Sequence, residues 1–549
     1  MRKSFIIFFL LLLCRVHSYG CTNFLVGKAA STDGSTIVSY AGDNFIRYGE
    51  LFRYPAALHP VGAMRNIFDY GSNKLLGQIL EASQTYSVIG HTNEFQVTIG
   101  ETTFGGRPEL TDTLGTIDYG SLIFIALQRS RTAREAIKVM TTLVAQYGYC
   151  SGGESFSIAD PNEIWIMEMV GKGVGNKGAL WVAVRIPDDC IAAHSNHSRI
   201  QQFNLKDKKN CLYSPDVISF ARSKGYFSGK DKDFSFAAAF DPIDFGGRRY
   251  SEARTWAFFN MFTSEGNTYL PYILGKSDIP MPLYMKPTRK LSVEDIKNAM
   301  RDHYENTPLD ISKDYGAGPY HAPYRLSPLS FKYEGREYFN ERPISTYQSA
   351  FVYVSQMRSN LPNAIGGVFW FAVDDANCAV FTPVYCCTDT VPRCLSHIAD
   401  AVTFNWDSSF WVFNWVSNMV YQRYDLMIGD LRRLQTEIES NFSHNQDSIE
   451  AVAKELYATN PAAAKKMLTN YSIACAQSTH DAWRKLGEFF IVKYNDGVVR
   501  QEKDGKFLKT QYGNAVSVKR PGYSQEFIKE YIRQTGDRYL IPKQEGEKK

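Results

Sequence analysis

The sequence predicts an α+β fold with a helical C-terminal portion, on three observations. Short β-prone runs separated by turn-forming residues recur up to about residue 385. Aromatic residues make up 14% of the chain, with 33 Tyr and 35 Phe, which favours β-rich packing over a helical bundle. Beyond about residue 410 the apolar spacing becomes helical. Because 44% of the 549 residues are hydrophobic, the chain can bury a large core, and wholesale disorder is excluded.

The first twenty residues have the pattern of a signal peptide. Arg2 and Lys3 precede an apolar run at 5–14, and this run of about ten residues is too short to cross a hydrocarbon core that needs roughly twenty. Small residues at Ser18 and Gly20 fit signal peptidase cleavage. We therefore predict an exported protein, secreted or periplasmic. A buried N-terminal strand or a short membrane anchor is the alternative reading.

Cleavage after Gly20 leaves Cys21 as the first residue of the mature chain. A lipoprotein signal also ends at a cysteine, but it normally has a Leu-like residue three positions earlier, where this chain has Ser18. Lipidation would cap Cys21 and exclude the chemistry considered below.

Charge argues against nucleic acid and against stable membrane association after signal removal. The chain has 61 Lys+Arg and 57 Asp+Glu, and the predicted signal peptide takes away Arg2, Lys3 and Arg15. A nearly neutral mature chain has no electrostatic attraction to either partner. The sequence leaves open whether the chain forms a homo-oligomer.

The strands expected early in the chain include two hairpins, each joining two β-prone runs through a turn rich in Asp, Asn, Gly or Pro. A single β-prone run and a later strand-rich block are predicted as strands for the same reason. The predicted strands are residues 21–26, 35–39, 95–99, 155–159 and 164–169, and the block 349–384.

Helices are expected between and after these strands. Ser130 is a candidate N-cap for a helix whose apolar residues, from Ala133 to Val144, recur at helical spacing. Apolar residues between 416 and 438 predict an amphipathic helix, and residues 448–456 begin another.

The last fifty residues are more polar and predict a frayed tail. The expected division is a signal peptide at 1–20, a main domain at 21–415, and a helical extension with a polar tail at 416–549.

The cysteines do not predict a metal site. Cys14 leaves with the signal peptide, and eight remain besides Cys21, a number compatible with disulfides in an exported protein. Four of them lie between Cys378 and Cys394, near His397, but without the paired C-x₂-C spacing of a zinc site. Local disulfides or core thiols are favoured there, and we predict no metal and no cofactor.

Cys21 carries the most informative chemistry because of its position. The sequence has no H-E-x-x-H, G-x-S-x-G or Walker motif. A cysteine that becomes the first residue supplies both a thiol nucleophile and an α-amine with a reference pKa of about 7.7–8.0. Nucleophile and general base then belong to one residue. The alternative is an ordinary half-cystine near a processing site.

The surrounding residues resemble the peptidase family C69 dipeptidases, which are N-terminal nucleophile hydrolases related to choloylglycine hydrolase and penicillin V acylase. The order and spacing of several motifs carry this resemblance, strongly from Cys21 to the 420s. They are C-T-N-F-L-V-G-K from Cys21, A-S-T-D-G-S-T-I from Ala30, N-E-F-Q-V from Asn93, I-G-E-T-T from Ile99, G-E-S-F-S-I-A-D from Gly153, I-M-E-M from Ile166, A-H-S-N-H-S-R-I from Ala193, E-R-P-I-S from Glu341, and Q-x-R from Gln356.

The resemblance implies a four-layer αββα sandwich with the nucleophile at the start of an inner strand. It implies that Cys21 is the nucleophile and that Asp43 holds its α-amine. Many relatives have Arg-Asn-x-Asp at this point, whereas this chain has Tyr40 and Ala41 in place of the arginine and the asparagine. This difference puts one positive orienting group in doubt.

The resemblance also implies three further site residues. Asn196 matches an oxyanion-hole asparagine, Asn93 is a second candidate donor, and Arg254 matches the site arginine, with Arg249 as the runner-up. Each has an ordinary alternative. Asp43 would cap a turn, both asparagines would bond loop backbone, and Arg254 would lie on a helix surface. Asn196 also begins an N-x-S sequon, and glycosylation there would exclude a site role.

These observations predict a secreted cysteine-type dipeptidase that hydrolyses short peptides through a thioester on Cys21. The alternatives are an N-acyl amide hydrolase, acting on bile-salt conjugates or a β-lactam side chain, and a non-catalytic secreted scaffold, for which the change at Tyr40 is the hint.

Overall fold

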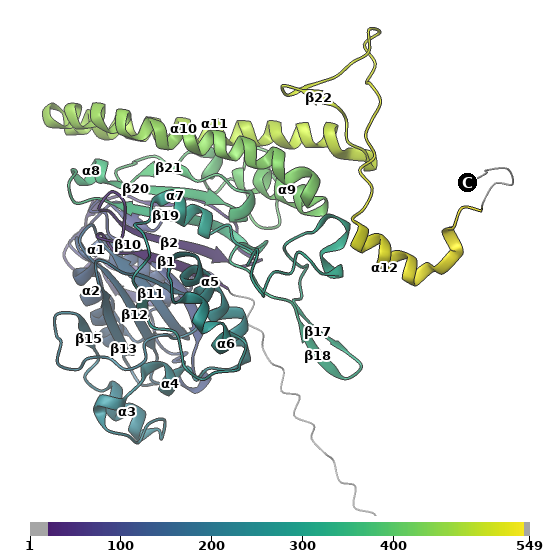
Figure 1. Ribbon diagram of the computed structural model, residues 1–549. Helices are drawn as coiled ribbons and strands as arrows, with labels where there is room; N and C mark the ends of the chain where they lie inside the picture. The colour runs from purple at the N-terminus through teal and green to yellow at the C-terminus, as the bar shows by residue number, and fades with distance from the viewer. Residues whose placement is uncertain (1–19, 543–549) are drawn as a thin grey trace, which may run out of the picture.

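The structure is a computed structural model that describes residues 20–542. The predicted signal peptide, apart from Gly20, lies outside the described residues. The expected α+β class is confirmed, since antiparallel sheets and helices together make up the molecule (Figure 1).

A seven-stranded antiparallel sheet holds the chain start in its middle. Its order is β16-β14-β1-β2-β19-β20-β21, and the predicted hairpin of residues 21–26 and 35–39 is confirmed as β1 and β2. The strands are β1 (Thr22–Val26), β2 (Thr36–Asp43), β14 (Ile191–His194), β16 (Tyr284–Met285), β19 (Ser349–Met357), β20 (Gly367–Val373) and β21 (Thr382–Tyr385).

An eight-stranded antiparallel sheet has the order β15-β13-β12-β11-β10-β9-β8-β3. Its strands are β3 (Arg53–Tyr54), β8 (Val88–Ile89), β9 (Thr92–Asn93), β10 (Thr98–Gly105), β11 (Gly153–Ala159), β12 (Ile164–Val170), β13 (Leu180–Ile186) and β15 (Cys211–Tyr213). The predicted hairpin of 155–159 and 164–169 is confirmed as β11 and β12. The expected strand at 95–99 is wrong over its first half, because Gln96 adopts a positive φ of 66° in a turn and β10 begins only at Thr98.

The two sheets face one another and helices cover their outer faces. Strands β1 and β2 contact β10, and hydroxyls bridge the sheets, with 2.7 Å between the Oγ1 of Thr98 and the Oγ of Ser355. On the outer face of the eight-stranded sheet lie α1 (Tyr119–Arg129) and α2 (Ala133–Tyr147). Against the seven-stranded sheet lie α5 (Ala253–Phe262), α7 (Val293–Ala299), α9 (Ser409–Gln422) and α11 (Pro461–Tyr494). With both faces covered, β2 and β19 are buried at every residue.

The cap of α2 differs from the expectation. Ser130 ends α1 in an extended conformation. Thr132 caps α2 instead, and its hydroxyl accepts a hydrogen bond from the backbone N–H of Glu135 at 3.2 Å.

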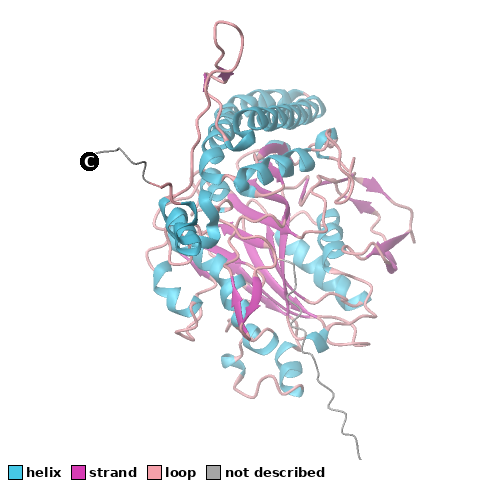
Figure 2. Ribbon diagram, turned by 90° about the vertical axis from the view of Figure 1, so that its right-hand side faces the viewer, coloured by secondary structure: helices cyan, strands magenta, loops and turns pink. Residues whose placement is uncertain are grey.

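The C-terminal helices are longer than the sequence pattern predicted. The chain breaks at Arg423 (φ −140°), where α9 ends, and α10 (Tyr424–Thr459) then runs without interruption through 448–456, where a separate helix was expected. No Gly or Pro interrupts the chain between residues 430 and 460, so nothing ends the helix earlier. Asn460 caps α11, which returns antiparallel along α10. The pair extends past the sheets in Figure 1 and is seen nearly end-on in Figure 2. The expected boundary at 415/416 falls inside α9.

The expected frayed tail contains a hairpin and an exposed helix. These belong to the remaining strands and α-helices, which are short. They are β4 (Ala57–Leu58), β5 (Met64–Phe68), β6 (Leu75–Leu80), β7 (Gln84–Thr85), β17 (Ser330–Tyr333), β18 (Arg336–Phe339), β22 (Glu502–Lys503), β23 (Lys506–Phe507), α3 (Val217–Ser223), α4 (Phe236–Phe240), α6 (Leu270–Ile273), α8 (Asn363–Gly366) and α12 (Gln525–Thr535). Within residues 20–542 every cysteine is a free thiol, and no helix there is long and apolar enough to span a membrane.

Candidate active site

The Cys21 thiol lies between the two sheets at the start of β1. Its side chain is buried, with 6% of its surface exposed. The Sγ atom lies 3.7 Å from the hydroxyl of Tyr40 on β2 and 3.7 Å from Oε1 of Glu101 on β10. A cysteine at this junction of strands from both sheets is enclosed by protein rather than by solvent.

The thiol is protonated in the chain that still carries Gly20. Burial raises the pKa of Cys21 well above its usual value, and the nearby carboxylates of Glu101 and Asp43 raise it further. The residue's nitrogen is an amide here, so it cannot serve as a base. A reactive thiolate therefore requires a proton acceptor that this form of the chain lacks at Cys21.

Gly20 is held at the same place by two polar contacts. Its N–H donates to the carbonyl of Asp43 at 3.3 Å, and its carbonyl accepts from Nη2 of Arg342 at 2.5 Å. The peptide bond between Gly20 and Cys21 therefore lies directly beside the Asp43–Arg342 pair.

Asp43 ends β2 and makes a buried ion pair. Its carboxylate accepts from Nη2 of Arg342 at 2.7 Å and from the hydroxyl of Ser349 at 2.6 Å, so it does not cap the turn that follows. Burial raises the pKa of Asp43 to about 6, although the Arg342 guanidinium opposes that shift. The structure brings this residue next to Cys21, as the sequence predicted.

Arg254 fixes the backbone at the start of β1. It sits on α5, where a π-helical segment, Gly247–Glu252, joins the helix. Its Nη1 donates to the carbonyl of Cys21 at 2.5 Å and to the hydroxyl of Thr22 at 2.6 Å. Only 1% of Arg254 is exposed, so the alternative of a helix-surface arginine is wrong. Burial, with help from Arg342, lowers its pKa to about 9.

Asn196 belongs to the same network but its amide is already bonded. It follows β14 in the left-handed region at φ 61°, which asparagine tolerates well. Its Nδ2 donates to the carbonyl of Thr103 at 2.6 Å, and its Oδ1 accepts from Nη2 of Arg254 at 2.8 Å. Asn196 is therefore linked to Cys21 through Arg254.

Asn93 bonds loop backbone, which was the alternative to a role in the active site. Its Nδ2 donates to the carbonyls of Leu127 and Ser130 at 2.7 and 2.8 Å, at the end of α1. Its Oδ1 accepts from the N–H groups of Phe95 and Val97. All of these contacts are to backbone of its own loop and of α1, and the structure does not bring Asn93 into the group around Cys21. The runner-up Arg249 also points elsewhere, forming an ion pair with Glu341.

Comparison with known proteins decides the family. The model of peptidase family C69 matches residues 20–437. The chain belongs to peptidase family C69. It is 27% identical over 409 residues to a probable dipeptidase of Salmonella dublin, covering 70% of this chain and 84% of that protein. It is 25% identical over 418 residues to dipeptidase A of Lactobacillus helveticus, covering 71% and 80%. A probable dipeptidase B of Lactococcus lactis is 26% identical over 462 residues, covering 78% and 89%. This C69 chain is thus a hydrolase of peptide bonds.

Three buried charged residues of the network around Cys21 were not singled out from sequence. Arg342, Glu101 and Glu154 all lie within motifs that carried the resemblance, but no chemical role was assigned to them. An available signal was an acidic residue directly before a predicted strand, as Glu154 is before residues 155–159. When buried, such a carboxyl is costly without a partner, so its presence points to a site.

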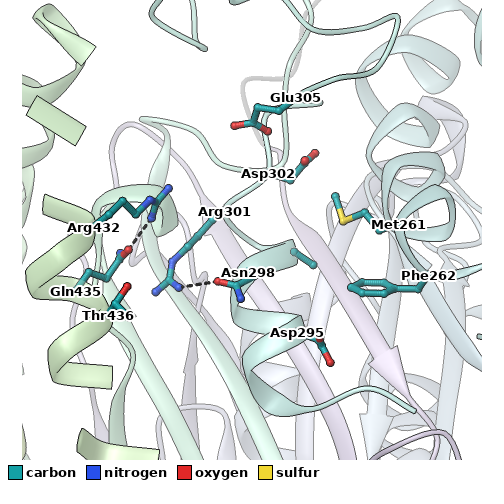
Figure 3. A pocket seen from close by; sticks show the side chains of 11 residues that line it. Met261, Phe262, Asp295, Asn298, Arg301, Asp302, Glu305, Arg432, Gln435 and Thr436 are labelled. Carbon is teal, nitrogen blue, oxygen red and sulfur yellow. Dashed lines mark hydrogen bonds between the residues drawn. The ribbon is translucent and has the colours of Figure 1, made fainter. Parts of the chain in front are cut away.

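A cavity of about 470 Å³ lies elsewhere in the C69 chain (Figure 3). It is lined by residues of α5, α7 and α10 and the loop after α7, among them Arg301, Asp302 and Arg432. None of the predicted site residues lines it. Within the described part of the chain, no group of three His, Cys, Asp or Glu side chains is placed to hold a metal ion.

Proposed function

We propose that this C69 peptidase is an exported cysteine-type dipeptidase whose nucleophile is Cys21, made N-terminal by removal of residues 1–20. The observation that carries the proposal is the buried thiol of Cys21 at the start of β1, with the Asp43–Arg342 ion pair beside the nitrogen that would become its α-amine. The names of the relatives support short peptides, and dipeptides in particular, as substrates.

The layered arrangement agrees with this chemistry. Two facing sheets with helices on both outer faces, and a nucleophile at the start of a central strand, fit the αββα sandwich of the N-terminal nucleophile hydrolases. We assign residues 21–415 to this catalytic sandwich and residues 416–549 to a helical extension that also packs on it, since α11 contacts β21. Export rests on the sequence of the first twenty residues alone.

The reaction begins when the α-amine of Cys21, directly or through one water, takes the thiol proton. The thiolate then attacks the peptide carbonyl, and a tetrahedral oxyanion forms. The new ammonium gives its proton to the leaving amine as the C–N bond breaks, which leaves a thioester on Cys21. Water hydrolyses the thioester and restores the enzyme. The ionised carboxylate of Asp43 stabilises the ammonium form between these steps.

Arg342 is the better candidate for a donor to the substrate carbonyl than either asparagine. Its Nη2 holds the Gly20 carbonyl, a contact that is freed when Gly20 leaves, and its buried Nη1 has no hydrogen-bond partner among the described residues. Asn196 and Asn93 already use their N–H groups on backbone carbonyls. A well-placed oxyanion donor contributes about 3–4 kcal/mol to the transition state.

The decisive experiment combines N-terminal sequencing with a dipeptide panel. The active species should begin at Cys21, and Cys21→Ala should abolish dipeptide hydrolysis, while a chelator should leave the rate unchanged. Cys475→Ala is the matched control, since that thiol is free and also 6% exposed but lies on α11. Hydrolysis by the Cys21→Ala protein would refute the nucleophile. Alkylation of Cys21 without turnover of any dipeptide or N-acyl amide would favour the scaffold alternative.

A further inference from the structure

A buried carboxyl group lies beside the thiol of Cys21, and a second buried carboxyl group lies beside the first. Glu101 on β10 and Glu154 on the adjacent β11 are 2% and 1% exposed. Oε1 of Glu101 lies 3.7 Å from Sγ of Cys21, and Glu154 is close enough to Glu101 for their side chains to interact directly. The proposed mechanism uses neither carboxyl.

Each carboxyl group has one oxygen bonded and one oxygen unbonded. Oε1 of Glu101 accepts from the Tyr40 hydroxyl at 2.6 Å, and Oε1 of Glu154 accepts from the Thr103 hydroxyl at 2.8 Å. The Oε2 atoms of both are buried and have no hydrogen-bond partner in residues 20–542. An unsatisfied buried acceptor costs about 1–3 kcal/mol, and more when charged. One proton shared between the two carboxyls can satisfy the pair while no ligand is bound, and a ligand that donates several hydrogen bonds would take its place.

The charge around the pair favours a cationic ligand. No ion pair joins Glu101 or Glu154 to a basic side chain within the described chain, although Arg47 acts on Glu101 from a distance. Burial raises the pKa of both groups, and their mutual repulsion raises that of Glu154 further. An arriving ammonium group would stabilise the ionised form of the pair and supply up to three N–H donors.

We propose that Glu101 and Glu154 bind the free α-ammonium group of the substrate and so restrict cleavage to the bond after the first residue of a peptide. This inference rests on the proposed function of Cys21. The α-nitrogen of a peptide lies about 2.5 Å from the carbonyl carbon of its own residue. A nucleophile in attacking position is about 3–3.5 Å from that carbon, and an N–H···O bond spans about 2.9 Å.

A one-residue acyl group can therefore fold back between the sulfur and Oε1 of Glu101, which lie 3.7 Å apart. A longer acyl group would place its α-ammonium farther from the sulfur. It would therefore place a neutral amide against the two carboxyls. An amide cannot replace the positive charge of the ammonium group.

The first test compares substrates. We expect Glu154→Gln to lower the ratio of kcat/KM for a free-amine dipeptide to that for its des-amino analogue at least tenfold. Glu101→Gln should lower the same ratio. Glu437→Gln, at an exposed position of α10, is the control and should leave the ratio as in the unaltered enzyme. A ratio unchanged in both Glu101→Gln and Glu154→Gln would overturn the inference.

The second test does not depend on peptidase activity. The Cys21 thiol is modified with cationic 2-aminoethyl methanethiosulfonate and with the neutral methyl reagent, and labelling of Cys21 is followed by peptide mass mapping. The cationic reagent should react faster, and Glu154→Gln should reduce that preference at least tenfold.

The two proposals fail in different ways. Absence of dipeptide turnover by the unaltered protein would refute the proposed function, whereas an unaltered labelling preference in Glu154→Gln would refute the ammonium site. If the pair instead holds the α-ammonium of Cys21 itself, both reagents would react equally fast and the inference would be wrong.

Discussion

Replacing Arg342 by Met should shift the acid limb of the pH–rate profile to higher pH. In the proposed mechanism the ionised form of Asp43 stabilises the Cys21 ammonium, so activity should be lost as pH falls through the pKa of Asp43. Burial already raises this pKa to about 6, against the opposing effect of Arg342. Removing the guanidinium 2.7 Å away leaves burial without that opposition.

The size of the shift follows from the contact that is lost. A hydrogen bond to a charged group contributes about 1.5–3 kcal/mol, and one pKa unit corresponds to about 1.4 kcal/mol. The pKa of Asp43 should therefore rise by about one to two units relative to the unaltered enzyme. Arg342→Lys, which keeps the charge, should shift it less.

The assay is kcat/KM for a dipeptide as a function of pH, because its limbs report groups of the free enzyme. Arg358→Met is the control, since Arg358 is in a similarly buried ion pair, with Glu450 at 2.6 Å, away from Asp43. Breaking either pair should cost about 3–5 kcal/mol of stability, but only the change at Arg342 should shift the limb. An acid limb that stays in place in folded Arg342→Met protein would refute the role given to Asp43.

Three further outcomes are expected. Arg254→Met should lower the free energy of unfolding by about 3 kcal/mol or more, seen as a lower denaturant midpoint, because the carbonyl of Cys21 and Oδ1 of Asn196 both lose their donor. Asn93→Ala should lower the free energy of unfolding by about 1–3 kcal/mol by the same measurement but keep kcat/KM within about twofold. A hundredfold loss of kcat/KM would instead show that Asn93 acts in the active site. Burial lowers the pKa of His197, but Asp241 at 2.8 Å outweighs it and leaves that pKa raised. The stabilisation of the folded protein by the His197–Asp241 pair should be fully present below about pH 6.5. It should be lost as pH rises through the raised pKa of His197, and it should be absent in Asp241→Asn.

The sequence was most informative where local chemistry alone sets the structure. Turn residues between β-prone runs located the hairpins β1–β2 and β11–β12, since register and turn are fixed within a few residues. It was less informative where distant contacts decide. The turn at Gln96 is held by Asn93 and by the backbone of residue 358, a contact far along the chain that no local pattern contains.

The same distinction applies to the site. Cys21 and Asp43 were predicted from position and motif, and they lie together because β1 and β2 are adjacent strands. Arg342 and Glu101 reach them from a distant loop and from the other sheet. A motif can show that such residues matter for the family, but only packing of the two sheets shows which atoms they meet.

The substitution at Tyr40 acquires a physical explanation from this packing. The sequence left in doubt the positive group that many relatives carry there, yet Arg342 supplies a guanidinium to Asp43 from elsewhere in the chain. Tyr40 meanwhile donates to Glu101 and holds that carboxyl beside the thiol. Two guanidinium groups, those of Arg342 and Arg254, therefore lie on the backbone side of Cys21 together with the carboxylate of Asp43, and Glu101 lies on its thiol side. A dipeptide carries a free ammonium group, so a site in which Glu101 binds that group, as we propose, would suit a short peptide better than an N-acyl amide, which has no ammonium to offer.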